Sequence, residues 1–385
     1  MPIYKMKGSK DGRQKYRVRV NYIDSLGKNR QIDRVAYGSA EAKDLERKLQ
    51  YELKEQTPTA RMTVNNLCDE YLNNAKSEVR ESTLEKTRTN INIYIKPLCG
   101  TTPLDKLTVP YLQKWKNEID NYISPKTHKP LSITSKQNVY SYFRILLNYA
   151  MKMDYIQTNN LTKLGNFKDK NTLSPKKEMD YYTIDEYKTF AAAARNIAEG
   201  SGSLTDWNYY VFFSIAFYTG LRKGEIFALK WSYITDNYLS VTRSITQKLK
   251  GVDRETPPKN KSSIRTLQMP KPLIDILNEH KKRYSEYPQF SDDFRICGGI
   301  KPIRDSSVSR ANENIAKAAG LKKIRIHDYR HSHVSLLANE GINIQEIARR
   351  LGHANIEMTW NTYSHLYPRE EERAVEILNK IVYAK

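Results

Sequence analysis

The sequence predicts a multidomain protein in which a small α+β segment is followed by an all-α segment and then by a longer, mixed but mainly α segment. Three observations support this fold class. The chain has 385 residues, more than the roughly 100–200 residues of a typical domain. Apolar residues recur at every second position near the N-terminus and at every third or fourth position further along. A polar, charged stretch with one proline, residues 165–183, is typical of a linker before the last segment.

The charge balance favours a polyanionic partner. Lys and Arg number 64 against 43 Asp and Glu, which gives a formal net charge of +21. This excess favours nucleic acid first and an anionic membrane surface second. No apolar run reaches the roughly 18 residues that a membrane span needs, and the N-terminus lacks the apolar core of a signal peptide. Cys68, Cys99 and Cys297 lie too far apart for a disulfide framework or a metal site. We therefore expect a cytoplasmic protein.

The first predicted domain, residues 1–57, combines a small sheet with one helix. Residues 16–22 alternate apolar and polar side chains, which predicts a strand whose polar face carries Arg17, Arg19 and Asn21. A turn and a second strand follow, and Ser39 then opens a helix. A solvated polar face would explain the basic character of this region. We favour DNA binding, because a basic β-ribbon fits the major groove.

The second predicted domain, residues 63–168, is helical. Ser82 and Glu85 have the spacing of a capping box, and Thr108 begins another helix. Six apolar residues then follow helical spacing, namely Val139, Tyr142, Phe143, Leu146, Leu147 and Ala150. Such a stripe is more often core than site, and the Lys and Arg residues on the other sides are most simply explained by solvation.

The third predicted domain, residues 178–385, holds the residues that can do chemistry. After a capping-box spacing at Thr183, the motif "TGLRKGE" places Arg222 at the start of a helix. A cation suits that place poorly unless an anion binds there. Glu225 is close enough in sequence to brace the arginine. In "TPPKNKSSIRTLQ", either Lys259 or Lys261 can reach a neighbouring cleft from a turn or hairpin.

Two later stretches add histidines, an arginine and a tyrosine. In "HDYRHSH", His327 and Arg330 are three residues apart and so share one helical face. His331 raises a zinc alternative, but there is no HExxH motif and no third ligand at an expected spacing. In "LGHANIEMTWNTY", His353 precedes Tyr363.

This set of residues suits metal-free transesterification of DNA. Two guanidiniums can hold the non-bridging oxygens of a pentavalent phosphate. A tyrosine hydroxyl, with an ordinary pKa of about 10, needs a base close by, and a histidine can supply it. A lysine can protonate the departing 5′ oxygen. No acidic cluster suits Mg²⁺, and we expect neither a metal nor a cofactor.

The motifs also carry a resemblance. "TGLRKGE", "KSSIR", "HDYRHS", "LGH" and "TYSH" occur in the order and approximate spacing of the tyrosine recombinase (λ integrase-like) family, and the whole chain resembles integrases of conjugative transposons. The resemblance implies that Arg222 and Arg330 bind the scissile phosphate. It also implies that His327 and His353 are the histidine pair and that Tyr363 is the nucleophile.

Further roles follow from the same resemblance. Lys261 is the implied general acid, in preference to Lys259. His331 is expected to be a supporting or packing residue. Tyr367, just before Pro368, is expected to pack.

The resemblance implies a three-stranded arm-binding domain at residues 1–57, a helical (SAM-like) core-binding domain at 63–168 and a catalytic domain with a tail helix at 178–385. The implied function is site-specific recombination through a 3′-phosphotyrosine, which integrates and excises a mobile element. The implied partners are double-stranded DNA with core-type and arm-type sites, other protomers of a tetramer that the tail helps to link, and an excisionase or DNA-bending protein. DNA binding would also place the protein on the bacterial nucleoid.

Two alternatives use the same features. A type IB topoisomerase shares the chemistry, but it would leave an arm-binding domain unexplained. A DNA-binding regulator without strand cleavage would need the basic segments but not the Arg-Lys-His-Arg-His-Tyr set.

Overall fold

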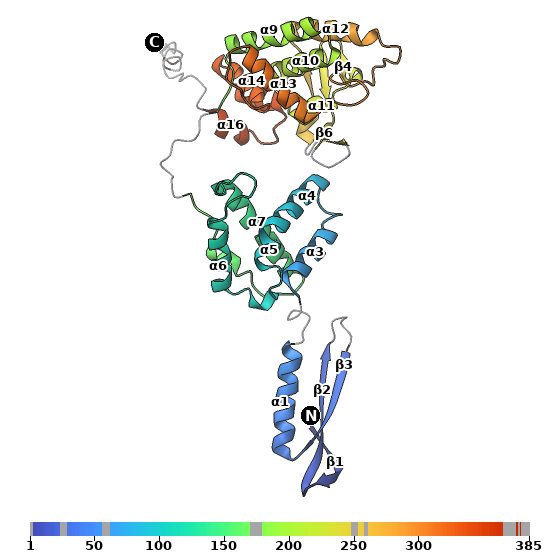
Figure 1. Ribbon diagram of the computed structural model, residues 1–385, viewed down its shortest axis with the longest axis vertical. Helices are drawn as coiled ribbons and strands as arrows, with labels where there is room; N and C mark the ends of the chain where they lie inside the picture. The colour runs from blue at the N-terminus through green and yellow to red at the C-terminus, as the bar shows by residue number, and fades with distance from the viewer. Residues whose placement is uncertain are drawn as a thin grey trace, which may run out of the picture. The chain divides into compact units, whose positions relative to one another are not determined.

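The structure is a computed structural model that describes residues 3–23, 29–55, 62–169, 179–247, 253–257 and 261–364, together with positions 375 and 378. The chain divides into two compact units, residues 1–174 and 175–385. Their elements are labelled in Figure 1. Lys259, Tyr367 and most of the expected tail helix lie outside the described residues.

The N-terminal unit begins with a three-stranded antiparallel sheet covered by one helix (Figure 1). The strands β1 (Ile3–Lys10), β2 (Arg13–Ile23) and β3 (Asn29–Tyr37) lie in the order β1-β2-β3. Helix α1 (Ser39–Glu55) follows directly. The expected combination of a three-stranded sheet and a helix is therefore confirmed.

The two faces of this sheet differ in chemistry. The small core is formed by Val18, Val20 and Ala36 of the sheet and by Ala42, Leu49 and Leu53 of α1. Because side chains alternate along a strand, Arg17, Arg19 and Asn21 lie on the face away from α1. Both arginines form ion pairs with Asp33 of β3, at 3.7 Å from Arg17 and 3.0 Å from Arg19.

The rest of the N-terminal unit is helical, and its helices are α3 (Val64–Asn74), α4 (Glu81–Asn90), the π-helical η1 (Ile91–Ile95), α5 (Lys96–Cys99), the 3-10 helix η2 (Leu104–Lys106), α6 (Val109–Asp120), α7 (Ile133–Lys152) and α8 (Leu161–Leu164). The predicted apolar stripe lies on α7, and all of it except the half-buried Tyr142 is buried in one core.

The two helix starts predicted in this region had different outcomes. Thr108 caps α6 and accepts a hydrogen bond from Tyr111 N, so this prediction is confirmed. The prediction at Ser82 is wrong. Helix α4 already begins at Glu81, after an extended Arg80 with φ −61° and ψ 140°, so Ser82 lies inside the helix.

The C-terminal unit packs helices around a long apolar helix, with two short sheets at one side. Its helices are α9 (Ile184–Ser201), α10 (Leu204–Thr219), α11 (Lys223–Ala228), η3 (Trp231–Tyr233), η4 (Lys261–Ser263), α12 (Lys271–Ser285), α13 (Asp305–Ala318), α14 (Asp328–Asn339), α15 (Ile344–Leu351) and α16 (Glu357–Tyr363). The strands β4 (Ile234–Thr235), β5 (Tyr238–Val241) and β8 (Arg265–Gln268) form one sheet, and β6 (Ser244–Thr246) and β7 (Arg254–Thr256) form the other.

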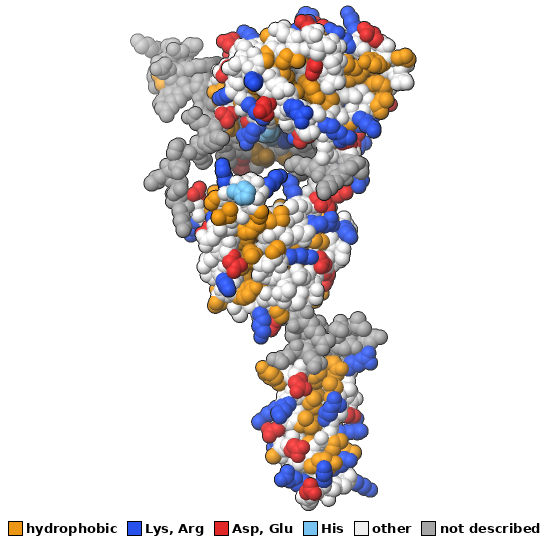
Figure 2. All heavy atoms as spheres, in the orientation of Figure 1, with side chains coloured by type: hydrophobic (Ala, Val, Ile, Leu, Met, Phe, Trp, Pro, Cys, Tyr) orange, Lys and Arg blue, Asp and Glu red, His pale blue; other side chains and the backbone are white. Residues whose placement is uncertain are grey.

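Helix α10 is the centre of this unit. It is apolar on nearly all sides, which is typical of a helix surrounded by protein, and it packs against α9, α12 and α14. Helix α9 begins with the predicted capping box, in which Thr183 and Glu186 exchange hydrogen bonds. Lys and Arg side chains gather along the lower edge of this unit in Figure 2, where α16 and β6 are labelled in Figure 1.

None of the helices in the described part of the chain combines the length and the apolar character that a bilayer crossing needs.

Candidate active site

The turn that carries Arg222 connects two helices of the C-terminal unit. Helix α10 ends at Gly220, whose φ of 64° is left-handed. A side chain there would also collide with His333, since a Cβ would lie 2.7 Å from its ring. Arg222 then forms the N-cap of α11. Its backbone N–H donates to Glu225 Oε2 (2.9 Å) and its Nη1 donates to Oε1 (3.0 Å), so the predicted brace is present.

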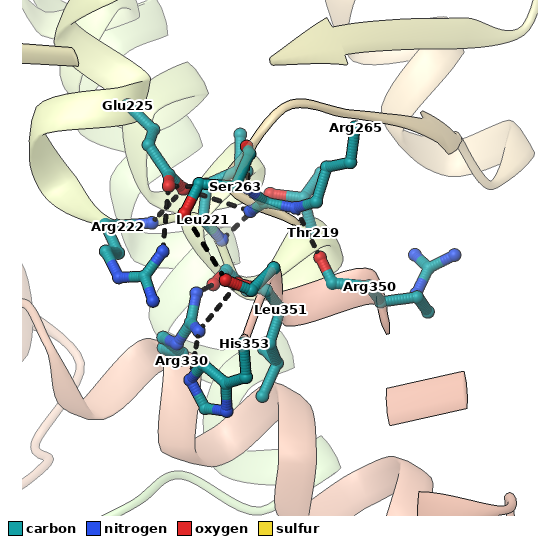
Figure 3. Close-up of polar contacts among 12 residues, drawn as sticks. Thr219, Leu221, Arg222, Glu225, Ser263, Arg265, Arg330, Arg350, Leu351 and His353 are labelled. Carbon is teal, nitrogen blue, oxygen red and sulfur yellow. Dashed lines mark hydrogen bonds and ion pairs between the residues drawn. The ribbon is translucent and has the colours of Figure 1, made fainter. Parts of the chain in front are cut away.

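Glu225 is itself held by a second arginine (Figure 3). Arg265 donates from Nη2 to Oε2 (3.0 Å) and from Nη1 to Oε1 (3.3 Å). Arg265 also donates to the backbone carbonyl of Arg350 (2.6 Å). Burial alone would raise the pKa of Glu225, but Arg265 and then Arg222 lower it below its ordinary value. Glu225 is therefore an ionised carboxylate that joins two guanidiniums.

Arg330 lies at the centre of the site (Figure 3). Its side chain comes from the first turn of α14, and the residue is 2% exposed. Nη1 donates to the carbonyl of Gly220 (2.8 Å), and Nη2 donates to the carbonyl of Leu351 (2.8 Å). Burial, followed by repulsion from Arg222, lowers the pKa of Arg330 to about 9. Two carbonyls hold this guanidinium without neutralising it, so its charge remains available to an anion.

His353 completes this cluster just beyond α15. Nη2 of Arg330 lies 2.7 Å from His353 Nε2. A guanidinium can only donate, so Nε2 accepts and the proton is on Nδ1. Nδ1 then donates to Oγ1 of the buried Thr359 (2.8 Å). Burial, and then Arg330, lower the pKa of His353 to about 4. The ring is therefore neutral and fixed in one tautomer.

His327 occupies the N-cap position of α14 without a capping hydrogen bond from its side chain, and the residue is exposed at the surface. Partial burial of its ring and then the charge of Arg330 lower its pKa. Its ring meets that of His331 edge to face, with centroids 5.1 Å apart. A cavity of about 480 Å³ lies beside it and is lined by Lys223, Lys323 and Arg325. Of the two predicted histidines, His327 is the one that faces solvent.

Tyr363 ends α16 and is 3% exposed. Its ring packs in a small cluster with Val334, Ile347 and Leu351. Burial raises the pKa of its hydroxyl to about 12, although Arg330 acts in the opposite direction. The hydroxyl lies 2.5 Å from Nδ1 of His331.

The contact agrees with the sequence expectation of a supporting residue, because His331 hydrogen-bonds to the hydroxyl of the predicted nucleophile. The sequence did not show that Tyr363 would be its partner. The four-residue spacing between His327 and His331 indicates only that both lie on one face of a helix. It could not show which residue of α16 would contact His331.

Lys261 is the first residue of the 3-10 helix η4, just before β8. The strand-like run expected after Lys261 is present as β8, and the turn before that strand is this 3-10 helix. The position of its side chain lies outside what the structure describes, so its role stays a prediction.

Arg265 was missed, although it belongs to the quoted motif "KSSIR". A signal was present, because Arg265 and Leu267 share one face of β8 and both are buried. An arginine on the apolar face of a strand marks a buried charge that needs a partner.

The structure thus brings four predicted residues close together from separate parts of the C-terminal unit. Arg330 touches His353 and the backbone beside Arg222, and Tyr363 reaches the same helix through His331. No group of three or more His, Cys, Asp or Glu in the described ranges is arranged to hold a metal ion.

Two family models match the chain. "Phage integrase family" matches residues 181–370, and "Phage integrase, N-terminal SAM-like domain" matches residues 63–119. Among curated relatives, the ICEBs1 integrase of Bacillus subtilis is 26% identical and the match covers 90% of this chain and 92% of that protein. A "Tyrosine recombinase XerC-like" protein of Caldanaerobacter subterraneus subsp. tengcongensis is 32% identical, over 44% of this chain and 48% of that protein.

Solved structures show the same fold. The Tn1549 transposon integrase in complex with transposon right end DNA has a TM-score of 0.63 at 19% identity, covering 83% of this chain and 99% of that one. A λ integrase dimer bound to a COC′ core site has a TM-score of 0.53 at 21% identity, covering 96% and 95%. Residues 181–370 carry the phage integrase family domain, and the chain is a tyrosine-type site-specific recombinase that resembles the integrases of conjugative transposons.

Proposed function

We propose that this recombinase integrates and excises a mobile element, with Tyr363 as its nucleophile. The observation that carries the assignment is the position of one buried guanidinium. Arg330 hydrogen-bonds to His353 and to the backbone two residues before Arg222. Three motifs that are distant in sequence are therefore in contact with one another through the guanidinium of Arg330.

The scissile phosphate is assigned to Arg222 and Arg330. Their guanidiniums can bind its non-bridging oxygens and offset the charge that develops in the pentavalent transition state. Both are positioned before DNA arrives, Arg222 by Glu225 and Arg330 by backbone carbonyls. His353 holds Arg330 in place, since its Nε2 accepts from that guanidinium.

The covalent step exchanges one phosphodiester for another. The Tyr363 hydroxyl gives up its proton to a histidine base, its oxygen attacks phosphorus and forms a bond to it, and the bond from phosphorus to the 5′ oxygen breaks. The DNA is left attached through its 3′ phosphate, and the 5′ oxygen takes a proton from a general acid, which we assign to Lys261. In rejoining, a 5′ hydroxyl attacks the phosphotyrosine and the bond to Tyr363 breaks. His327, the other member of the proposed histidine pair, is exposed.

Three regions of the chain are assigned to DNA. Residues 1–57 are proposed to bind arm-type sites, residues 63–168 to bind core-type sites, and residues 178–385 to carry out catalysis. The arm-type contacts are assigned to the sheet face that carries Arg17, Arg19 and Asn21. Since the two arginines share the single carboxylate of Asp33, that face keeps a net positive charge.

Assembly on DNA is proposed by likeness to relatives. Solved neighbours include a λ integrase tetramer bound to a Holliday junction. We propose a tetramer of this chain on its recombining sites, linked by the tail after Tyr363 and assisted by an excisionase or a DNA-bending protein. We place the protein in the bacterial cytoplasm, associated with the nucleoid when bound to DNA. Deleting residues 369–385 should then impair synaptic assembly and recombination while single-site binding survives, and full-rate recombination would contradict a linking role.

A suicide substrate tests the function itself. A core site with a nick near the cleavage position releases a short fragment and traps the covalent complex. We expect a protein–DNA band that survives denaturation. A regulator without cleavage activity would bind the same DNA and give no such band.

A further inference from the structure

A histidine outside the predicted set contacts the reactive oxygen of the predicted nucleophile. His331 comes from α14 and Tyr363 from α16, and Nδ1 of the histidine lies 2.5 Å from the tyrosine hydroxyl. Both side chains are largely enclosed, because the His331 side chain is 12% exposed and Tyr363 is 3% exposed. Water therefore competes little for this hydrogen bond.

The direction of this hydrogen bond follows from proton affinity. The Tyr363 hydroxyl keeps its proton, because burial raises its pKa to about 12. His331 is neutral, because burial and then the neighbouring His327 lower its pKa to about 4. The hydroxyl therefore donates and Nδ1 accepts, which places the remaining ring proton on Nε2.

A buried carboxylate favours the same tautomer. Oδ1 of Asp328 lies 3.9 Å from Nε2 of His331. Asp328 is 0% exposed and is held in place by Arg325, whose backbone N–H and guanidinium both donate to it. A negative charge beside Nε2 stabilises a proton there and also stabilises the imidazolium form of the ring. Asp328, His331 and Tyr363 thus form an ordered series of carboxylate, imidazole and hydroxyl.

We propose that His331 is a catalytic residue that accepts the proton of Tyr363 during DNA cleavage. As the tyrosine oxygen bonds to phosphorus, its O–H bond breaks and the proton moves to Nδ1 of His331. The bond from phosphorus to the 5′ oxygen breaks, and that oxygen is protonated by the separate general acid. Rejoining reverses each transfer, so that His331 returns its proton to Tyr363. The inference rests on the proposed function, because it assumes that Tyr363 attacks the phosphate.

His331 suits this task better than His327. The contacts of the described residues include a hydrogen bond from Tyr363 to His331, whereas the ring of His327 makes a T-shaped contact with the ring of His331. The charged and titratable groups that face His331 are His327, Asp328, Arg325 and Arg330. Burial, and then His327 and the two arginines, lower its pKa and keep it neutral at rest. A bound phosphate adds negative charge to the site, which together with Asp328 favours the imidazolium when the proton arrives.

Substitutions of His331 can separate two capacities of its side chain. One is to accept a hydrogen bond from the Tyr363 hydroxyl, and the other is to take up the proton. In His331→Asn the amide oxygen replaces Nδ1 as a hydrogen-bond acceptor but cannot take up a proton. In His331→Ala both capacities are lost. General base catalysis is commonly worth about 10²–10⁴ in rate, so we expect both full-length variants to cleave a suicide substrate at least ~100-fold more slowly, with unchanged DNA affinity. Asp275→Asn, on the exposed surface of α12, is the control and should cleave at the wild-type rate.

Two further measurements distinguish proton acceptance from packing. Added imidazole should restore cleavage by His331→Ala but not by His331→Asn, whose amide fills the space. The cleavage rate of His331→Ala should rise about tenfold per pH unit from pH 7 to 9, since an unassisted tyrosine must ionise first. The wild-type rate should not rise in this way, because its base is already neutral.

A modified leaving group gives the third measurement. With a 5′-bridging phosphorothiolate, the departing sulfur needs no general acid. The defect of His331→Ala should persist on this substrate, whereas a Lys261→Ala defect should be relieved. Wild-type cleavage rates in His331→Asn, or full relief of His331→Ala by the phosphorothiolate, would overturn the inference. A wild-type protein that forms no covalent complex at all would instead overturn the proposed function.

Discussion

Oε2 of Glu225 lies 3.0 Å from Nη2 of Arg265, and both side chains are at least 95% buried. The same carboxylate also binds Arg222, so a single negative charge fixes two guanidiniums. The pair connects the start of α11 to the strand that follows Lys261. Loss of this ion pair should therefore lower the stability of the C-terminal unit and also shift the side chain of Arg222.

Glu225→Gln should destabilise the protein by about 3–5 kcal/mol, because it leaves Arg265 buried without a counter-charge. Thermal or denaturant unfolding of the full chain, followed by a probe of the C-terminal unit, measures this loss. Asp275→Asn is the control, since Asp275 pairs with Lys271 on an exposed helical surface and should cost less than about 1 kcal/mol. Equal effects of the two substitutions would show that the buried pair adds no special stability.

Tyr363→Phe should abolish the covalent protein–DNA complex and leave DNA binding intact. The substitution keeps the ring that packs beside α14 and removes only the attacking oxygen. Denaturing gels of the suicide-substrate reaction measure the first effect, and mobility shifts measure the second. Tyr367→Phe should still form the complex. A covalent band from Tyr363→Phe would assign the nucleophile to another residue.

Cleavage should proceed in the presence of EDTA. In the proposed mechanism, Arg222 and Arg330 supply the positive charge that metal ions supply in many phosphoryl-transfer enzymes. The measurement is the rate of covalent complex formation with and without the chelator, at constant ionic strength. A strict requirement for Mg²⁺ in the cutting step would contradict the assigned mechanism.

Residues 1–57 should bind DNA on their own, at sites distinct from those that are cut. This segment has its own apolar core between the sheet and α1. Binding should weaken steeply with salt, since each phosphate contact releases counterions. Arg17→Ala should lower the slope of the logarithm of the binding constant against the logarithm of salt concentration by about one, which is one phosphate contact. Glu41→Gln at the start of α1 should not lower this slope. Absence of binding at low salt would mean that the basic face has another purpose.

The C-terminal unit should lose stability as the pH falls from about 6.5 toward 4, because two of its buried histidines resist protonation. Burial lowers the pKa of His280 to about 4 and that of His333 to about 3. The unfolded chain takes up these protons near pH 6.5, whereas the folded chain does not. Each histidine therefore removes about 1.4 kcal/mol of stability per pH unit across this window.

Unfolding free energies at pH 7, 6 and 5 measure this loss. His280→Gln should reduce the slope of unfolding free energy against pH by the contribution of one proton. An unchanged slope would show that His280 already binds a proton in the folded protein.

Local features of the fold could be predicted from the sequence, because their interactions join residues close in the chain. Thr183 and Thr108 each cap a helix with a neighbour three residues away. The failure at Ser82 shows the limit of such a pattern, since the backbone of Arg80 decides where α4 begins. The short 3-10 helix at Lys261 likewise depends on packing that the motif does not describe.

The candidate active-site set and the brace between Arg222 and Glu225 could be predicted from the sequence, but the contacts between distant segments could not. Arg265 and Glu225 are 40 residues apart, and His331 and Tyr363 are 32 residues apart. Periodicity shows which side of a helix is apolar, but it does not show which helix that side meets. For that reason the two most informative contacts of the site came only from the structure.

The burial of Tyr363 has a consequence for the host chromosome. A protein with a DNA-breaking hydroxyl meets many phosphodiesters that it must leave intact. With 3% of the residue exposed and a pKa of about 12, that oxygen is a weak, enclosed nucleophile in the unbound protein. Enclosure and a raised pKa therefore limit attack by this oxygen on phosphodiesters in the unbound protein. Only DNA that reaches the arginines and the enclosed hydroxyl together is at risk of being cut.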